Sequence, residues 1–187
     1  MKEQIDAAIK VLKRGGVIVY PTDTIWGIGC DATNSEAVEK IYKIKRRADS
    51  KSLILLASGT EMINRYIKQI PEIAYSLIEL NDKPMTIVYP GATGLAENVI
   101  AEDGSVGIRI PMSDFCIELL KRFRKPVVST SANISGTPAP DSFGNIAEEI
   151  LREADYVVPA EFERSSTHKA SQILKIGTGG EIEIIRK

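Results

Sequence analysis

The chain has 187 residues, of which 43% are hydrophobic, and a formal net charge of −1. This length is sufficient for one domain with a proper core. The near-zero charge excludes a surface that is basic throughout and built to hold nucleic acid, although a local basic patch is compatible with it. A single histidine, His168, argues against both a zinc site and a Ser-His-Asp triad.

Two cysteines, Cys30 and Cys116, lie far apart and form no CxxC pair, which indicates free thiols in a reducing compartment. The sequence contains neither a signal-peptide pattern nor an apolar run long enough to span a bilayer. It also contains no internal repeat, linker or low-complexity tract. We therefore expect one cytoplasmic domain over residues 1–187, with no membrane partner.

Helices and strands alternate along much of the chain. Apolar residues at helical spacing, capping residues, and β-branched runs bounded by Gly or Pro predict the elements. In chain order they are a helix over 5–12, a strand over 17–20, a helix over 35–44, a strand over 52–57, a short helix over 60–66, a helix over 71–80, strands over 83–89 and 105–111, a helix over 114–123, a strand over 126–130, a short helix over 146–151, a strand over 155–159 and a closing hairpin of 171–176 with 181–185. Such a series is typical of an α/β protein.

Small polar residues follow two of these strands at the point where each strand ends. The first group is Thr22–Thr24, directly after Pro21, and the second is Ser131–Gly136. In α/β proteins ligands bind beyond the carboxyl ends of strands, whereas the alternative is a pair of ordinary turns. Because Asn133 and the hydroxyls exceed what one turn requires, we predict a shared polar cleft.

A dense cationic cluster ends the second predicted helix. Its members are Lys43, Lys45, Arg46, Arg47 and Lys51, opposed only by Asp49. One or two cations offset a helix dipole, but so many like charges repel one another unless an anion joins them. This cluster therefore favours a phosphate-binding function.

Arg109 lies between Ile108 and Ile110, so strand alternation points its side chain away from its apolar neighbours. It is either a solvated residue or a clamp for a ligand. By contrast, we interpret the second basic run, at residues 121–125, as a solvated helix end. We expect the polar stretch 161–169 to be mobile, with His168 at the surface.

The motifs PTDTIWGIG, KIKRR, SVGIRIP, STSANISG, SQILKI and IEIIRK occur in this order. The set resembles the YrdC-type threonylcarbamoyl-AMP synthases over nearly the whole chain, in their short form without an extra C-terminal domain. The resemblance implies a single YrdC-like α/β domain (YrdC/RibB-like), in which a twisted mixed sheet with flanking helices surrounds a large open cleft.

The resemblance also implies a reaction. L-threonine, bicarbonate and ATP, with Mg²⁺ accompanying the ATP, give threonylcarbamoyl-AMP and pyrophosphate. A threonylcarbamoyl transferase partner then moves the group to an adenosine beside the tRNA anticodon. No protein residue is implied as a metal ligand.

Motif positions carry the family's roles to particular residues of this chain. Thr24 resembles the contact to threonine, and Arg109 resembles the clamp on its carboxylate. The ATP-binding positions are Lys45, Arg47, Lys51, Ser131, Asn133, Ser171 and Arg186, and the catalytic positions are Lys45, Arg47 and Arg109.

Four positions depart from the family pattern. Trp26 replaces a usual Tyr or Phe, Ser52 a Pro, Leu56 a His and Lys83 a Gly. Two alternatives stay open at this point. One is a paralogue that binds double-stranded RNA or tRNA and lacks synthase activity, whose RNA affinity would fall steeply with salt. The other is carbamoyl-adenylate chemistry on a different acceptor, which would not require L-threonine.

Overall fold

The structure is a computed structural model and describes residues 1–46, 53–163 and 166–187. Its elements in chain order are α1 (Lys2–Lys13), β1 (Ile18–Tyr20), β2 (Gly27–Gly29), α2 (Ser35–Ile44), β3 (Ile54–Leu56), α3 (Thr60–Ile63), α4 (Glu72–Glu79), β4 (Met85–Tyr89), η1 (Glu97–Val99), β5 (Val106–Arg109), α5 (Asp114–Phe123), β6 (Val127–Ser131), η2 (Phe143–Asn145), α6 (Glu148–Glu153), β7 (Tyr156–Val157), η3 (Ala160–Phe162), β8 (Gln172–Ile176) and β9 (Ile182–Arg186). None of the helices in these ranges has the length and hydropathy needed to cross a membrane.

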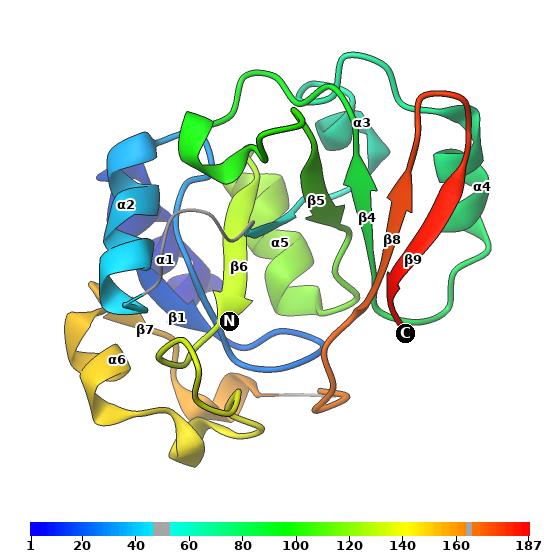
Figure 1. The fold of residues 1–187 in the computed structure, drawn as a ribbon. Coiled ribbons are helices and arrows are strands. Elements are labelled where there is room, and N and C mark those ends of the chain that lie inside the picture. The colour runs from blue at the N-terminus through cyan, green and yellow to red at the C-terminus, as the bar shows by residue number, and fades with distance from the viewer. Residues whose placement is uncertain (47–52, 164–165) are drawn as a thin grey trace.

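Within the described residues, the strands form one nine-stranded sheet in the order β7-β1-β2-β6-β3-β5-β4-β8-β9. The pairs β1–β7, β3–β5 and β4–β8 are parallel, and the other neighbours are antiparallel. Helices gather at both ends of the sheet, with α1, α2 and α6 around β1 and β7, and α3 and α4 beside β4 and β9 (Figure 1). The predicted α/β fold with a twisted mixed sheet is confirmed.

Two apolar clusters hold the helices on opposite faces of the sheet. The stripe of α1 packs with α5 against strand residues that include Tyr20, Leu56 and Val127. The apolar residues of α2, α3 and α4 pack against alternate strand residues such as Leu55 and Val128. Because neighbouring strand residues point to opposite faces, the two clusters follow from the sequence pattern of the strands.

Local chemistry sets several helix ends. The Asn34 side chain accepts a hydrogen bond from the backbone N–H of Ala37 at 3.1 Å and begins α2. Ser113 begins α5 in the same way, through the N–H of Cys116, and Arg124 ends that helix in the left-handed conformation. The sequence predicts Thr60 as the cap of a short helix through residue 66, but Gly59 is the N-cap, Thr60 is the first helical residue, and the helix ends at residue 63.

The prediction did not include β2, because glycine is depleted in strands. Gly29 is nevertheless required where it stands. A Cβ added at Gly29 would lie 1.9 Å from the carbonyl oxygen of Val128 on β6. The absence of a side chain therefore lets β2 approach β6, and through them β1 joins the rest of the sheet.

Candidate functional site

A cavity of about 920 Å³ lies along one face of the sheet. Its lining comes from the turn between β1 and β2, from β3, β4, β5, β6, β8 and β9, and from the loops around residues 101–103, 139 and 170. Leu56, which packs under α1 and α5, is the register partner of the cavity residue Arg109. The cavity therefore occupies the part of that sheet face that α1 and α5 leave uncovered, and its size suits a nucleotide-sized ligand.

Five of the sequence-predicted site residues line this cavity, although they come from five separate segments. They are Thr24, Arg109, Ser131, Ser171 and Arg186. The predicted shared cleft is thus present, since the polar residues after β1 and those at the end of β6 meet in it. Arg47, Lys51 and Ser52 lie outside the described residues.

The turn after β1 fixes the direction of one hydroxyl. The Thr22 O–H donates to the carbonyl of Ile25 at 2.7 Å, and the Thr22 oxygen lies 2.9 Å from the hydroxyl oxygen of Thr24. Because the Thr22 hydroxyl carries one proton, Thr24 is the donor in the second contact. The Thr24 hydroxyl therefore offers the cavity only acceptor lone pairs, which suit an N–H or ammonium group.

Arg109 is the buried cation of the cavity. It is 4% exposed, and its Nη1 donates to both carboxylate oxygens of Asp23 at 3.0 Å. The sequence left open whether Arg109 is solvated or a ligand clamp. Its burial excludes the solvated alternative and places a paired guanidinium at the cavity wall.

A second guanidinium, that of Arg186 on β9, reaches the same cavity. Its Nε and Nη2 donate to the carbonyl of Ser171 at 2.9 and 2.7 Å, and the Ser171 and Thr86 hydroxyl oxygens lie 2.8 Å apart. Desolvation, followed by the nearby charge of Arg109, lowers the pKa of Arg186. Two guanidinium groups close enough to repel, with Asp23 paired to one of them, form a site that favours an anion.

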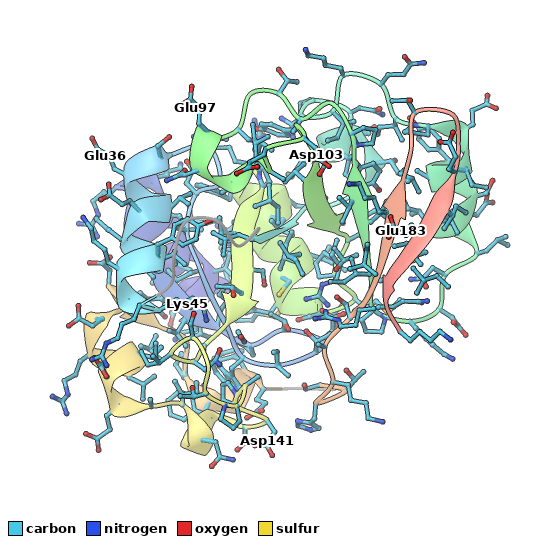
Figure 2. All side chains as sticks on the ribbon, in the orientation of Figure 1. Glu36, Lys45, Glu97, Asp103, Asp141 and Glu183 are labelled. Carbon is cyan, nitrogen blue, oxygen red and sulfur yellow. The ribbon has the colours of Figure 1, made fainter. Side chains whose placement is uncertain are left out.

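Lys45 lies at the end of α2, beside the loop that follows β6 (Figure 2). Its side chain is buried, and Nζ donates to the backbone carbonyls of Ser131 and Asn133 at 2.5 and 2.7 Å. The side-chain oxygen of Asn133 is a third acceptor at 3.2 Å. Lys45 and Asn133 are not among the residues that line the cavity. The sequence did not predict this contact between Lys45 and the loop after β6, and the role of Lys45 as a phosphate ligand stays a prediction.

The family profile described as “Telomere recombination”, of the Sua5, YciO and YrdC proteins, matches residues 10–187. The chain belongs to the Sua5/YciO/YrdC family. The threonylcarbamoyl-AMP synthase of Hahella chejuensis is 32% identical over 176 residues, which are 94% of this chain and 95% of that protein. The family resemblance drawn from the motifs is confirmed.

Solved structures of the Sua5/YciO/YrdC family share the architecture. P. abyssi Sua5 in complex with L-threonine matches with a TM-score of 0.86 and 25% identity, over 94% of this chain and 52% of that one. E. coli YciO shares the fold with a TM-score of 0.82 at 20% identity, over 100% of this chain and 90% of that one. The chain spans about half the length of P. abyssi Sua5.

Two features of this Sua5/YciO/YrdC site are absent from the sequence prediction. The first is the Asp23–Arg109 pair, which joins residues 86 positions apart. The second is the attachment of the segment after η3, whose Ser166 hydroxyl donates to the carbonyl of Thr24 and whose Thr167 N–H donates to the carbonyl of Asp23 at 2.9 Å. Neither has a local sequence signal, because both depend on contacts between distant segments.

The lining of the cavity also includes an exposed ion pair between Asp103 and Lys175. Lys175 Nζ donates to the carboxylate of Asp103 at 2.7 Å, and the Ser105 hydroxyl donates to the same carboxylate at 2.6 Å. The bonds from Lys175 and Ser105 lower the pKa of Asp103 to about 2. Across residues 1–46, 53–163 and 166–187, no group of three or more His, Cys, Asp or Glu side chains is placed to hold a metal ion.

Proposed function

We propose that this protein is a threonylcarbamoyl-AMP synthase, acting on L-threonine, bicarbonate and ATP. The observation that carries the proposal is the convergence, in one cavity of about 920 Å³, of the Thr24 acceptor with the guanidinium groups of Arg109 and Arg186. The names of the relatives support the same reaction, as does the L-threonine complex of P. abyssi Sua5.

The chemistry requires positioning more than it requires a protein nucleophile. The amine of threonine and bicarbonate combine, with loss of water, into a carbamate. A carbamate oxygen then attacks the α-phosphorus of ATP, and the bond to the pyrophosphate oxygen breaks. Both reactants are anions, so the protein must hold them in line and stabilise the charge on the departing pyrophosphate. Arg and Lys side chains serve both purposes.

Each residue has a role that matches its observed donors and acceptors. In our proposal the Arg109 guanidinium binds the carboxylate of threonine, and the Thr24 oxygen accepts a hydrogen bond from its amine. In the same proposal Arg186, Ser171 and Ser131, which all line the cavity, contact the nucleotide. Asn133 supports the loop that carries Ser131.

The triphosphate is assigned by family resemblance to Lys45, Arg47 and Lys51, of which the last two lie outside the described residues. Magnesium would enter bound to ATP and neutralise part of the phosphate charge. Mg²⁺ in such complexes keeps several waters, so the proposal needs no acidic cluster in the protein. We further propose that residues 1–187 act as one domain in the cytoplasm, that the product passes to a threonylcarbamoyl transferase, and that the modified molecule is tRNA.

Binding of double-stranded RNA without catalysis is the less favoured alternative. The cavity supports a small anionic ligand, and the named relatives support the synthase. A different carbamoyl acceptor is also less favoured, because the named relatives are threonylcarbamoyl-AMP synthases.

The decisive experiment incubates the purified protein with Mg-ATP, bicarbonate and L-threonine. We expect pyrophosphate release that depends on threonine, together with the adenylate detected by mass spectrometry. Arg109→Ala should raise the threonine KM and lower kcat/KM by about a hundredfold, because a charge-assisted contact to the substrate is lost. Threonine-independent release would point to another acceptor. An Arg109→Ala variant affected only in its ATP KM would contradict the placement of the carboxylate.

A further inference from the structure

We propose that Asp23 is a positioning residue that selects which edge of the Arg109 guanidinium faces the substrate. The inference rests on the proposed function, because it assumes that Arg109 binds the carboxylate of threonine. Asp23 does not line the cavity, whereas Arg109 does. Asp23 therefore acts on the substrate only through Arg109.

A guanidinium can grip a carboxylate with two parallel hydrogen bonds along either of two edges, Nε–Nη2 or Nη1–Nη2. In this structure Nη1 donates to both Oδ1 and Oδ2 of Asp23, each at 3.0 Å. Nη1 has two N–H groups, and the two carboxylate oxygens of Asp23 accept both of them, so no Nη1 N–H is left for a ligand at the Nη1–Nη2 edge. Among the described residues, neither Nε nor Nη2 of Arg109 donates a hydrogen bond to another side chain. The Nε–Nη2 edge is the fork that stays available to a ligand.

Both partners of this pair are held by rigid backbone. The carbonyl of Arg109 accepts the N–H of Ala57 at 3.0 Å, and β5 is paired on both sides, with β3 and β4. Asp23 lies in the turn that the Thr22 hydroxyl closes, and its carbonyl accepts the N–H of Thr167. The side chains of Asp23 and Arg109 are 7% and 4% exposed, so water does not compete for the pair. The orientation of the fork is thus set before a ligand arrives.

The sign of the mutational effect separates positioning from simple charge balance. The negative charge of Asp23 opposes the approach of a second carboxylate to Arg109. If charge balance were its whole role, removing that charge would strengthen threonine binding. If Asp23 positions the fork, the neutral isostere leaves Arg109 with a weaker acceptor and two competing edges, and threonine binding weakens.

Asp23→Asn tests the proposal, and Asp31→Asn is the matched control. Asp31 is also a buried carboxylate with a lysine partner, Lys125, at 2.7 Å, but it does not line the cavity or contact Arg109. The readouts are the KM values for threonine and ATP, kcat, and the midpoint of thermal unfolding. For Asp23→Asn we expect the threonine KM to rise about tenfold or more, with the ATP KM within about twofold of wild type. Asp31→Asn should lower the unfolding midpoint and leave both KM values unchanged.

A double-mutant cycle keeps the proposal testable if Asp23→Asn is poorly folded at the assay temperature. Arg109→Lys replaces the planar fork by a point charge, which has no edge to select. Below the unfolding midpoint of each variant, Asp23→Asn should therefore change the threonine KM by less than about twofold when Arg109 is already Lys. A full tenfold effect in that background would overturn the proposal, because Asp23 would then act without the fork.

Other results would overturn it as well. A threonine KM that is unchanged or lower in Asp23→Asn contradicts positioning, as does an equal rise in the KM values for both substrates. Wild-type protein without threonine-dependent pyrophosphate release would refute the proposed function and this inference together. Active wild-type protein with an unaffected Asp23→Asn variant would refute this inference alone.

Discussion

Lys45→Met separates a structural role of the ammonium from a role in phosphate binding. The buried Nζ of Lys45 has three protein acceptors, on Ser131 and Asn133, at 2.5, 2.7 and 3.2 Å. Hydrogen bonds to a charged group contribute about 1.5–3 kcal/mol each, and a carbonyl left buried without a donor costs a similar amount. These terms are not additive, so we expect the variant to lose about 2–4 kcal/mol of unfolding free energy.

The measurement is thermal unfolding of ligand-free protein, followed by ATP binding. For a chain of this length, a loss of about 2–4 kcal/mol lowers the unfolding midpoint by roughly 5–15 °C. Arg46→Met is the control, because Arg46 is the next cation but is 67% exposed and paired with the exposed Glu149. Exposed pairs contribute about 0–1 kcal/mol. A Lys45→Met variant as stable as Arg46→Met, but defective in ATP binding, would refute the structural role.

Two further predictions follow from burial. Gly29→Ala should lower the unfolding free energy by about 3 kcal/mol, because its Cβ would lie 1.9 Å from the Val128 carbonyl oxygen. Gly107→Ala is the control, and it should lower the unfolding free energy by less than about 1 kcal/mol, because its nearest contact is at 3.4 Å. Urea denaturation measures both values, and equal losses would contradict the close approach of β2 and β6. Burial raises the pKa of the Cys116 thiol from 9.0 to about 12, and raises the pKa of Cys30 as well. A thiol whose pKa is raised in the folded state contributes its full stabilisation below pH 9, and this contribution is lost as the pH rises from 9 to 12. At pH 10 each thiol should therefore lower the unfolding free energy by about 1.4 kcal/mol relative to its value well below pH 9. Urea denaturation between pH 8 and 10.5 measures how the unfolding free energy falls with pH, and Cys116→Ala should reduce this fall. Rapid chemical labelling of both thiols in the native protein at pH 8 would show that they are not buried.

Features that depend on near neighbours in the chain could be predicted from the sequence. The strand that Pro21 follows and the helix over 35–44 need only local sequence patterns, and both are present. The polar groups after β1 and β6 were predictable for a similar reason, since the ends of strands in one sheet share an edge. Family motifs added the particular residues, such as Arg109 and Arg186, that no periodicity distinguishes from solvated arginines.

Features that depend on the partner across the fold could not be predicted. Strand propensity argues against β2, and only the carbonyl of Val128 shows why Gly29 stands there. The KIKRR motif indicates that Lys45 is a cation but not where its side chain points. That direction is set by the carbonyls of Ser131 and Asn133, which lie about 90 residues away in the sequence. The choice of Asp23 as the partner of Arg109 likewise arises from the way β1 and β5 are placed in the sheet.

The position of β9 gives the cavity one wall that can open independently of the rest. Every residue of β9 is exposed, and within the described chain this strand is hydrogen-bonded only to β8 (Figure 1). Fraying of β9 therefore breaks few apolar contacts and carries Arg186 away from the cavity, while Arg109 stays fixed inside the sheet. Amide hydrogens of β9 should exchange with solvent faster than those of β5. A ligand that contacts Arg186 would slow their exchange, so the wall would close as the site fills.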